Sequence, residues 1–149
     1  GNQYKKLKRM AGPNIEFTGF VTEQEKKRLL ATSRALIFPT DEDFGIVPVE
    51  AQLSGRPVIG FGHGGLLETT EENISSVLFR EQTPEALIDA VKRFEKVENS
   101  FDPHRIREAA LRFDKSVFMN KLKEYIDTEY SKWHQSLINL DTIHHRAIF

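Results

Sequence analysis

The chain has 149 residues, with 21 Lys and Arg against 22 Asp and Glu, and a formal net charge of −1. This balance argues against a protein that coats nucleic acid or binds membrane surfaces through a polybasic patch. The chain has no cysteine, which excludes disulfide scaffolds, cysteine-ligated zinc and thiol nucleophiles. No apolar run approaches the roughly 20 residues of a membrane-spanning helix, and no signal peptide is visible, so we expect a cytoplasmic protein.

The first third of the chain predicts two helices and two strands. Residues 4–11 have a helical pattern of apolar residues, and residues 15–19 are predicted as a short strand. Thr22 and Glu25 fit the capping box that begins a helix. The apolar run over residues 35–38 predicts a strand that is buried on both faces. Since the first helix lacks a strand before it, we expect an N-terminally truncated domain.

The rest of the chain continues this alternation of strands and helices. Two more strands are predicted over residues 57–60 and 77–79, and a glycine-dense loop over residues 60–65 follows the first of them. Helices are predicted over residues 46–53, from Leu66, after Thr83 and Asp102, and from about Asp114 to Tyr130.

This order of elements predicts an α/β fold with a Rossmann-like parallel sheet flanked by helices. We expect one Rossmann-like domain over residues 1–130 and a C-terminal tail or crossing helix over residues 131–149. Ligands of such sheets bind outside the carboxyl ends of the strands. The prediction therefore places residues 19–21, 39–45 and 60–65 along one crevice.

The segment between the second strand and the helix after it carries the chemistry. Glu42 and Glu50 are separated by seven residues, and Gly45 lies between them where the chain has to bend. The main-chain N–H groups of Gly45, Ile46 and Val47 are free donors at a helix N-terminus, which attracts anions. Carboxylates repel a phosphate bound there, so they are expected to face hydroxyl groups of the ligand. This pattern predicts a phosphorylated sugar as the ligand.

The segment from Glu42 to Glu50 resembles the E-x7-E signature of the retaining GT-B glycosyltransferases of family 4. Three more blocks, residues 14–21, 54–60 and 64–69, resemble blocks of the same family in the same order. The similarity runs from about residue 4 to about residue 126, and it is greatest to bacterial O-antigen mannosyltransferases. It implies the C-terminal, donor-binding half of a GT-B fold.

The resemblance also implies a role for single residues. Glu42 is the expected catalytic residue, which binds the hydroxyls of the donor sugar, and Glu50 is expected to hold the ribose. The remaining donor-binding residues are those whose amides meet the sugar and the diphosphate, Phe44, Gly45, Ile46 and Val47, and those that border the nucleobase, Phe20 and Val21. The glycine loop adds His63, Gly64 and Gly65 as further candidates. The family works without a bound metal, and no cofactor is expected.

The implied reaction transfers mannose from GDP-mannose, with retention, to a surface-polysaccharide or lipid-linked acceptor. The acceptor-binding domain and the basic residues that grip the diphosphate precede the part of the family that this sequence covers. We therefore expect this chain to bind the donor, to need its N-terminal partner domain for activity, and to lie at the inner face of the membrane in the full-length enzyme.

Two alternatives remain open at this point. Gly60, Gly62 and Gly65 fit the G-x-G-x-x-G pattern of an NAD(P)-binding oxidoreductase, with Glu81 near the expected ribose-binding position. A non-catalytic nucleotide-sugar-binding module is the other alternative. Enhancement of NADH fluorescence would favour the oxidoreductase, and protection by GDP or UDP sugars would favour the glycosyltransferase.

The C-terminal tail carries apolar residues with weak periodicity, namely Trp133, Leu137, Ile138, Leu140 and Ile143. Such residues seek another surface when they are not packed against their own domain. We therefore predict a homo-oligomer formed through the tail, which a strictly monomeric species at high concentration would contradict.

Overall fold

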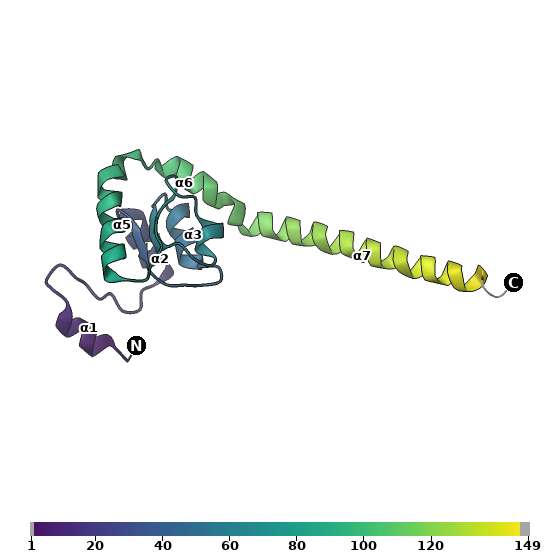
Figure 1. Cartoon of the computed structure of the whole chain (residues 1–149), viewed down its shortest axis with the longest axis horizontal. Helices are drawn as coiled ribbons and strands as arrows, with labels where there is room; N and C mark the ends of the chain where they lie inside the picture. Colours follow the sequence, from purple (N-terminus) through teal and green to yellow (C-terminus); the bar gives the residue numbers. More distant parts are fainter. Residues whose placement is uncertain (1, 147–149) are drawn as a thin grey trace.

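The computed structural model describes residues 2–146, with side chains as far as residue 137. Its centre is a three-stranded parallel sheet in the order β1-β2-β3, formed by Leu36–Phe38, Val58–Phe61 and Ser76–Phe79 (Figure 1). Val58 lies opposite Leu36 on one side and Ser76 on the other. Because the strands are parallel, the loops that follow β1 and β2 leave the sheet at the same edge.

Helices connect the strands and cover the sheet. The segment α3 (Ile46–Leu53) joins β1 to β2, and α4 (Leu66–Thr69) joins β2 to β3. The other elements of the domain are α1 (Tyr4–Met10), α2 (Glu23–Thr32), α5 (Pro84–Val97), η1 (Glu98–Ser100), α6 (Pro103–Ala110) and η2 (Leu111–Phe113). The predicted α/β class and parallel sheet are confirmed.

Neighbouring residues of β2 belong to different cores, because side chains alternate along a strand. Val58 packs with the residues of α2, α3 and α4, and Ile59 packs with those of α5. The first core contains Leu30, Ala51, Val58, Leu66 and Leu78, and the second contains Ile59, Val77, Phe79, Ala90 and Phe94. The sheet is therefore the middle layer of three.

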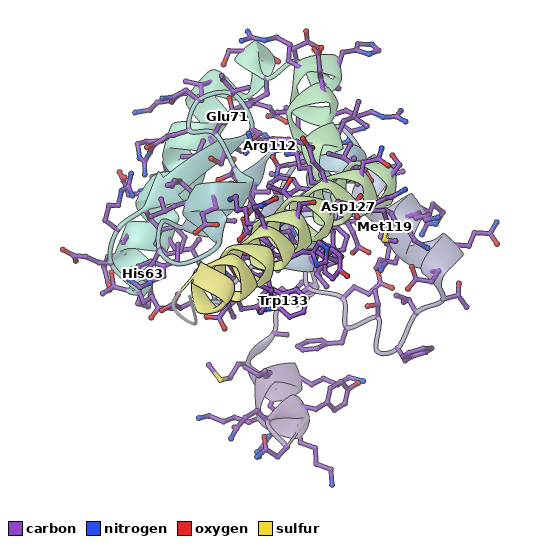
Figure 2. The ribbon with its side chains drawn as sticks, turned by 90° about the vertical axis from the view of Figure 1, so that its right-hand side faces the viewer. His63, Glu71, Arg112, Met119, Asp127 and Trp133 are labelled. Carbon is purple, nitrogen blue, oxygen red and sulfur yellow. The ribbon has the colours of Figure 1, made fainter. Side chains whose placement is uncertain are left out.

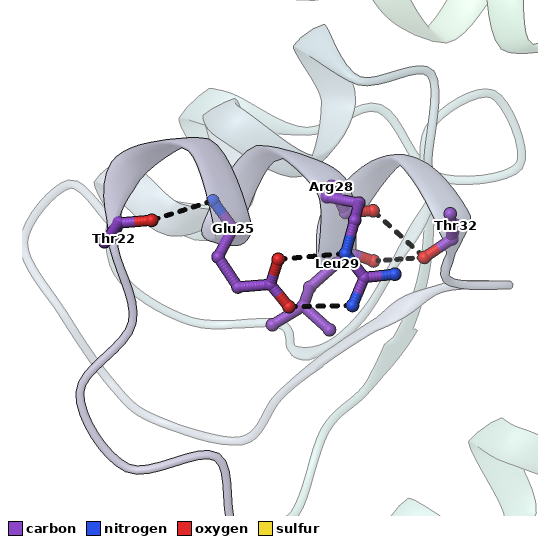
Figure 3. Close-up of polar contacts among 5 residues, drawn as sticks. All are labelled: Thr22, Glu25, Arg28, Leu29 and Thr32. Atoms are coloured by element: carbon purple, nitrogen blue, oxygen red, sulfur yellow. Dashed lines mark hydrogen bonds and ion pairs between the residues drawn. The ribbon is translucent and has the colours of Figure 1, made fainter.

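The helix α2 begins as predicted, but only half of its capping box forms (Figure 3). Thr22 Oγ1 accepts a hydrogen bond from Glu25 N at 3.2 Å. The Glu25 carboxylate binds the guanidinium of Arg28 through two hydrogen bonds, of 2.9 and 2.7 Å, instead of returning to the N-cap. A two-point pair of opposite charges is stronger than one hydrogen bond to a neutral amide. It also lowers the pKa of Glu25.

Two predictions about the strands are wrong. Residues 15–19 form no strand, and Ile15 is 53% exposed, because none of the strands described pairs with this segment. A segment with the sequence pattern of a strand forms a strand only if its main chain can hydrogen-bond to a neighbouring strand, and the pattern does not reveal whether one is present. The run over residues 35–38 forms β1, but Ile37 is 50% exposed, since β1 is an edge strand and α5 packs mainly against β2 and β3.

The last helix, α7 (Lys115–Arg146), extends away from the domain (Figure 1). The predicted end near Tyr130 is wrong, because the helix continues without a break. Phe118, Tyr125 and Trp133 are among its large exposed side chains. The side chains of Ile138, Leu140 and Ile143 lie outside the described residues, so self-association through them stays a prediction. Among the helices described, none combines the length and the apolar character needed to cross a membrane.

Candidate functional site

The loops that follow β1 and β2 are in backbone contact at the carboxyl edge of the sheet. Gly65 N donates a hydrogen bond to Glu42 O at 2.9 Å. A Cβ atom on Gly65 would lie 2.2 Å from Asp43 O, and one on Gly64 would lie 2.7 Å from Glu42 O. No side chain fits at such distances, so the two glycines allow the glycine loop (residues 62–65) to lie directly on the acidic loop (residues 41–43).

His63 adds a side-chain contact between the same loops. Its Nδ1 lies 3.0 Å from Asp41 Oδ1, and its ring stacks on Phe61 with 5.7 Å between ring centroids and an interplanar angle of 21°. Figure 2 shows His63 far from Glu71 and Arg112, which pair with each other elsewhere on the domain. The sequence singled out His63 but not Asp41, because nothing in the local pattern relates residues 22 positions apart.

The acidic loop leads directly into the N-terminus of α3. Gly45 is the N-cap, with a φ of 78° that favours glycine, and no side chain caps the helix. Phe44, Ile46 and Val47 are 44%, 67% and 41% exposed. The first amides of α3 therefore lie near the surface without a side-chain cap, and together with the helix dipole they can bind an anion.

Glu50 lies one turn inside α3 and is paired with a residue of α2. Lys26 Nζ donates to Glu50 Oε1 at 2.7 Å and also lies 3.1 Å from Glu23 Oε2. The hydrogen bond to Glu50, and then that to Glu23, raises the pKa of the Lys26 ammonium. Within the part of the chain that the structure describes, Glu50 Oε2 is buried and has no hydrogen-bond partner. Glu50 is therefore more than a solvated helix residue.

A hollow of about 410 Å³ adjoins this pair. Its lining includes Lys26, Lys27, Leu30, Glu50, Ser54 and Arg107, which come from α2, α3, the residue after α3, and α6. Sequence analysis missed Lys26, because its place beside Glu50 depends on the packing of α2 against α3. The only sequence signal is a basic residue within a predicted helix, and that is typical of any exposed helix face.

The ring of Phe44 turns toward the start of α7. It meets Phe113 edge to face, with 5.6 Å between centroids, beside a hollow of about 490 Å³ that Arg112, Phe118 and Lys121 also line. No signal in the sequence relates Phe44 to Phe113. Among the residues described, no group of three or more His, Asp or Glu side chains is placed to hold a metal ion.

Phe20 and Val21 do not extend from the edge of the sheet. Because residues 15–19 form no strand, the two residues lie in the irregular segment before α2, where Phe20 is 98% exposed and Val21 half-buried. The structure thus brings together the loops after β1 and β2 and the N-terminus of α3. None of the strands described carries residues 19–21 to that edge, and their predicted placement along the same crevice stays a prediction.

Comparisons with known proteins show the family to which this domain belongs. The family model described as "Glycosyl transferases group 1" matches residues 2–113. The D-inositol 3-phosphate glycosyltransferase of a Nocardioides species is 33% identical over 101 residues, which cover 67% of this chain and 22% of that protein. The human alpha-1,3/1,6-mannosyltransferase ALG2 is 31% identical over 97 residues, which cover 61% of this chain and 23% of that protein. The chain thus spans less than a quarter of these two relatives.

A solved structure gives the same fold. The sucrose-phosphate synthase of Thermosynechococcus elongatus superimposes with a TM-score of 0.77 at 20% identity. The alignment covers 88% of this chain and 34% of that one. With most of the domain matched by the family model, and with its sheet, helices and loops in the arrangement described above, the chain belongs to the glycosyl transferases group 1 family.

Proposed function

We propose that this domain binds the nucleotide-sugar donor of a retaining glycosyltransferase, and that the donor is GDP-mannose. The observation that carries the proposal is the N-terminus of α3, which lacks a side-chain cap and lies between Glu42 and Glu50. An anion attracted by the amides would have a carboxylate on either side for the hydroxyls of the same ligand. Similarity to ALG2 mannosyltransferases supports mannose as the sugar.

Each part of the donor then has a proposed partner. The amides from Phe44 to Val47 bind the diphosphate and the adjoining sugar, Glu42 binds the sugar hydroxyls, and the carboxylate of Glu50, whose side chain is 30% exposed, binds the ribose hydroxyls. Phe20 and Val21, in the segment just before α2, border the nucleobase in this proposal.

The proposed chemistry is assistance to the leaving group. As the bond between the sugar C1 and the diphosphate oxygen breaks, positive charge develops on the sugar ring and negative charge on the diphosphate. Amides that already point at the diphosphate stabilise this charge without reorganising. The oxygen of the acceptor hydroxyl then bonds to C1 on the face that the diphosphate leaves, and its proton passes to the departing diphosphate oxygen. We propose a surface polysaccharide or a lipid-linked glycan as the acceptor, from the resemblance of the motifs alone.

The glycine pattern that suggested an oxidoreductase has another explanation. A Cβ on Gly60 would lie 2.3 Å from Leu66 Cδ2, and one on Gly62 would lie 2.8 Å from Arg80 Nη1. These glycines therefore serve the packing of β2 and its loop. The comparisons give the nicotinamide alternative no support.

Calorimetric titration with GDP and GDP-mannose tests the assignment of the two glutamates. Glu50→Gln is expected to lower the affinity for both ligands. Glu42→Gln is expected to lower only the affinity for GDP-mannose. Loss of a hydrogen bond to a charged group costs about 1.5–3 kcal/mol, which corresponds to about 10- to 150-fold in affinity. Glu81→Gln is the matched control. It makes the same chemical change at a glutamate to which only the rejected oxidoreductase alternative gives a ligand contact. Equal effects of the two variants on both ligands would refute the assignment.

A further inference from the structure

His63 is held at the carboxyl edge of the sheet by contacts that leave one edge of its ring open. Asp41 Oδ1 lies 3.0 Å from Nδ1, Phe61 stacks on the ring face, and the His63 main-chain N donates to Phe61 O at 2.8 Å. Among the residues whose side chains are described, none forms a hydrogen bond with Nε2. The side chain is 65% exposed. The ring is thus fixed in orientation but free to meet a ligand.

The carboxylate decides what kind of ligand group Nε2 can meet. The Asp41 carboxylate can accept a hydrogen bond from an Nδ1–H group, and in that tautomer Nε2 is a hydrogen-bond acceptor. An acceptor needs a ligand that donates an O–H or N–H. A fully ionised diphosphate offers no such proton. A sugar hydroxyl has the required chemistry.

The glycine loop also fixes His63 relative to Glu42. Gly65 N donates to Glu42 O, and Gly64 approaches the same carbonyl so closely that no side chain would fit. Two residues on loops joined in this way keep their separation when a ligand enters. We infer that His63 Nε2 accepts a hydrogen bond from a hydroxyl of the donor's sugar, and that Asp41 positions the ring for this contact. The inference rests on the proposed donor site.

Comparing the affinity for a nucleotide sugar with that for its nucleoside diphosphate separates a lost contact to the sugar from a general loss of ligand binding. Calorimetric titrations use GDP-mannose with GDP and UDP-glucose with UDP, and the pair that binds more tightly is followed. His63→Ala is expected to lower the affinity for the nucleotide sugar about 3- to 10-fold and that for the diphosphate less than about 2-fold. The first change corresponds to the loss of one neutral hydrogen bond. His63→Gln, which keeps an acceptor oxygen, is expected to restore most of the affinity. His104→Ala, an exposed histidine on α6, is the matched control.

Asp41→Asn tests whether Asp41 positions the His63 ring, by a measurement that would not change if Asp41 had only a structural role. The ¹⁵N chemical shifts of the His63 ring report which nitrogen carries the proton, and Asp41→Asn is expected to shift the population away from the Nδ1–H form. It should also weaken the nucleotide sugar about 2- to 5-fold, with little effect on the diphosphate, because the ring is less well oriented.

Each remaining outcome overturns a defined statement. If the unaltered domain binds neither ligand of either pair, the proposed function fails, and the His63 contact fails with it. If the domain binds both ligands but His63→Ala keeps its affinity for the nucleotide sugar, only the His63 contact fails. An equal loss for the sugar and the diphosphate, with an unchanged thermal unfolding midpoint, would also overturn it.

Discussion

Alanine in place of Gly65 is expected to force the glycine loop and the acidic loop apart. Gly65 has φ −62° and ψ −18°, which any L-residue can adopt, so the substitution introduces no backbone strain of its own. Its Cβ would lie 2.2 Å from Asp43 O and 2.5 Å from Phe44 Cα. Since real Cβ contacts are essentially never shorter than 3.0 Å, the carbonyl has to retreat by at least 0.8 Å, the difference between 3.0 and 2.2 Å.

Main-chain atoms cannot relieve this overlap by changing rotamer, so we expect Gly65→Ala to destabilise the domain by about 1–3 kcal/mol. The displaced chain carries Glu42 and the N-cap Gly45, and binding of GDP-mannose should therefore weaken at least about 10-fold. Urea unfolding followed by circular dichroism measures the first effect, and calorimetry measures the second. Gly12→Ala is the control, because an added Cβ there would meet only the side-chain atom Asn14 Oδ1, at 2.9 Å, and no main-chain atom within 4 Å. It should change the stability little and keep the affinity for the donor. A Gly65→Ala domain with unchanged stability and affinity would refute the contact between the loops.

Three further predictions concern the fold. Thr22→Ala removes the N-cap of α2 and should lower the free energy of unfolding by about 1 kcal/mol in urea titrations. Gln52→Leu leaves two backbone carbonyls, 3.2 and 2.9 Å from the buried amide nitrogen, without this donor and should cost about 1–3 kcal/mol in the same assay. Hydrogen bonds from Ser116 lower the pKa of Asp114, so its stabilising effect is present above its ordinary pKa and is lost as the pH falls through the lowered value. Thermal unfolding midpoints of Asp114→Asn should accordingly depend less on pH in the acid range than those of the unaltered domain.

The helix starts were predictable because their signals act over two or three residues. Thr83 Oγ1 accepts from Ala86 N at 3.2 Å, and Asp102 Oδ1 accepts from His104 N at 2.8 Å, as the Thr-Pro and Asp-Pro pairs of the sequence predict. The strand predicted over residues 15–19 fails for the opposite reason. A strand is stable only beside a partner, and the periodicity of one segment says nothing about its partner.

The site shows the same division between local and distant information. Gly45 could be placed at the bend before α3 from its immediate neighbours, and its φ of 78° confirms the need for glycine there. Lys26 and Asp41 could not be assigned, because their partners lie 24 and 22 residues away and meet them only after the sheet has formed. A sequence motif therefore identifies only those site residues that are close in the sequence. The partners that orient them are brought into contact by tertiary packing.

The ion pair between Lys26 and Glu50 allows α3 to bind a phosphate at its first amides and a hydroxyl group at Glu50. A free carboxylate one turn from the helix N-terminus would repel a phosphate bound at the first amides. Lys26 offsets that charge from the side of α2, at 2.7 Å from Oε1, while Oε2 keeps an unused acceptor. A carboxylate whose charge is offset by a lysine suits a hydroxyl better than a phosphate, and the amides of α3 suit a phosphate better than a hydroxyl. A ligand with a phosphate and a hydroxyl-bearing ring next to it satisfies both groups at once, and a nucleoside diphosphate has this composition.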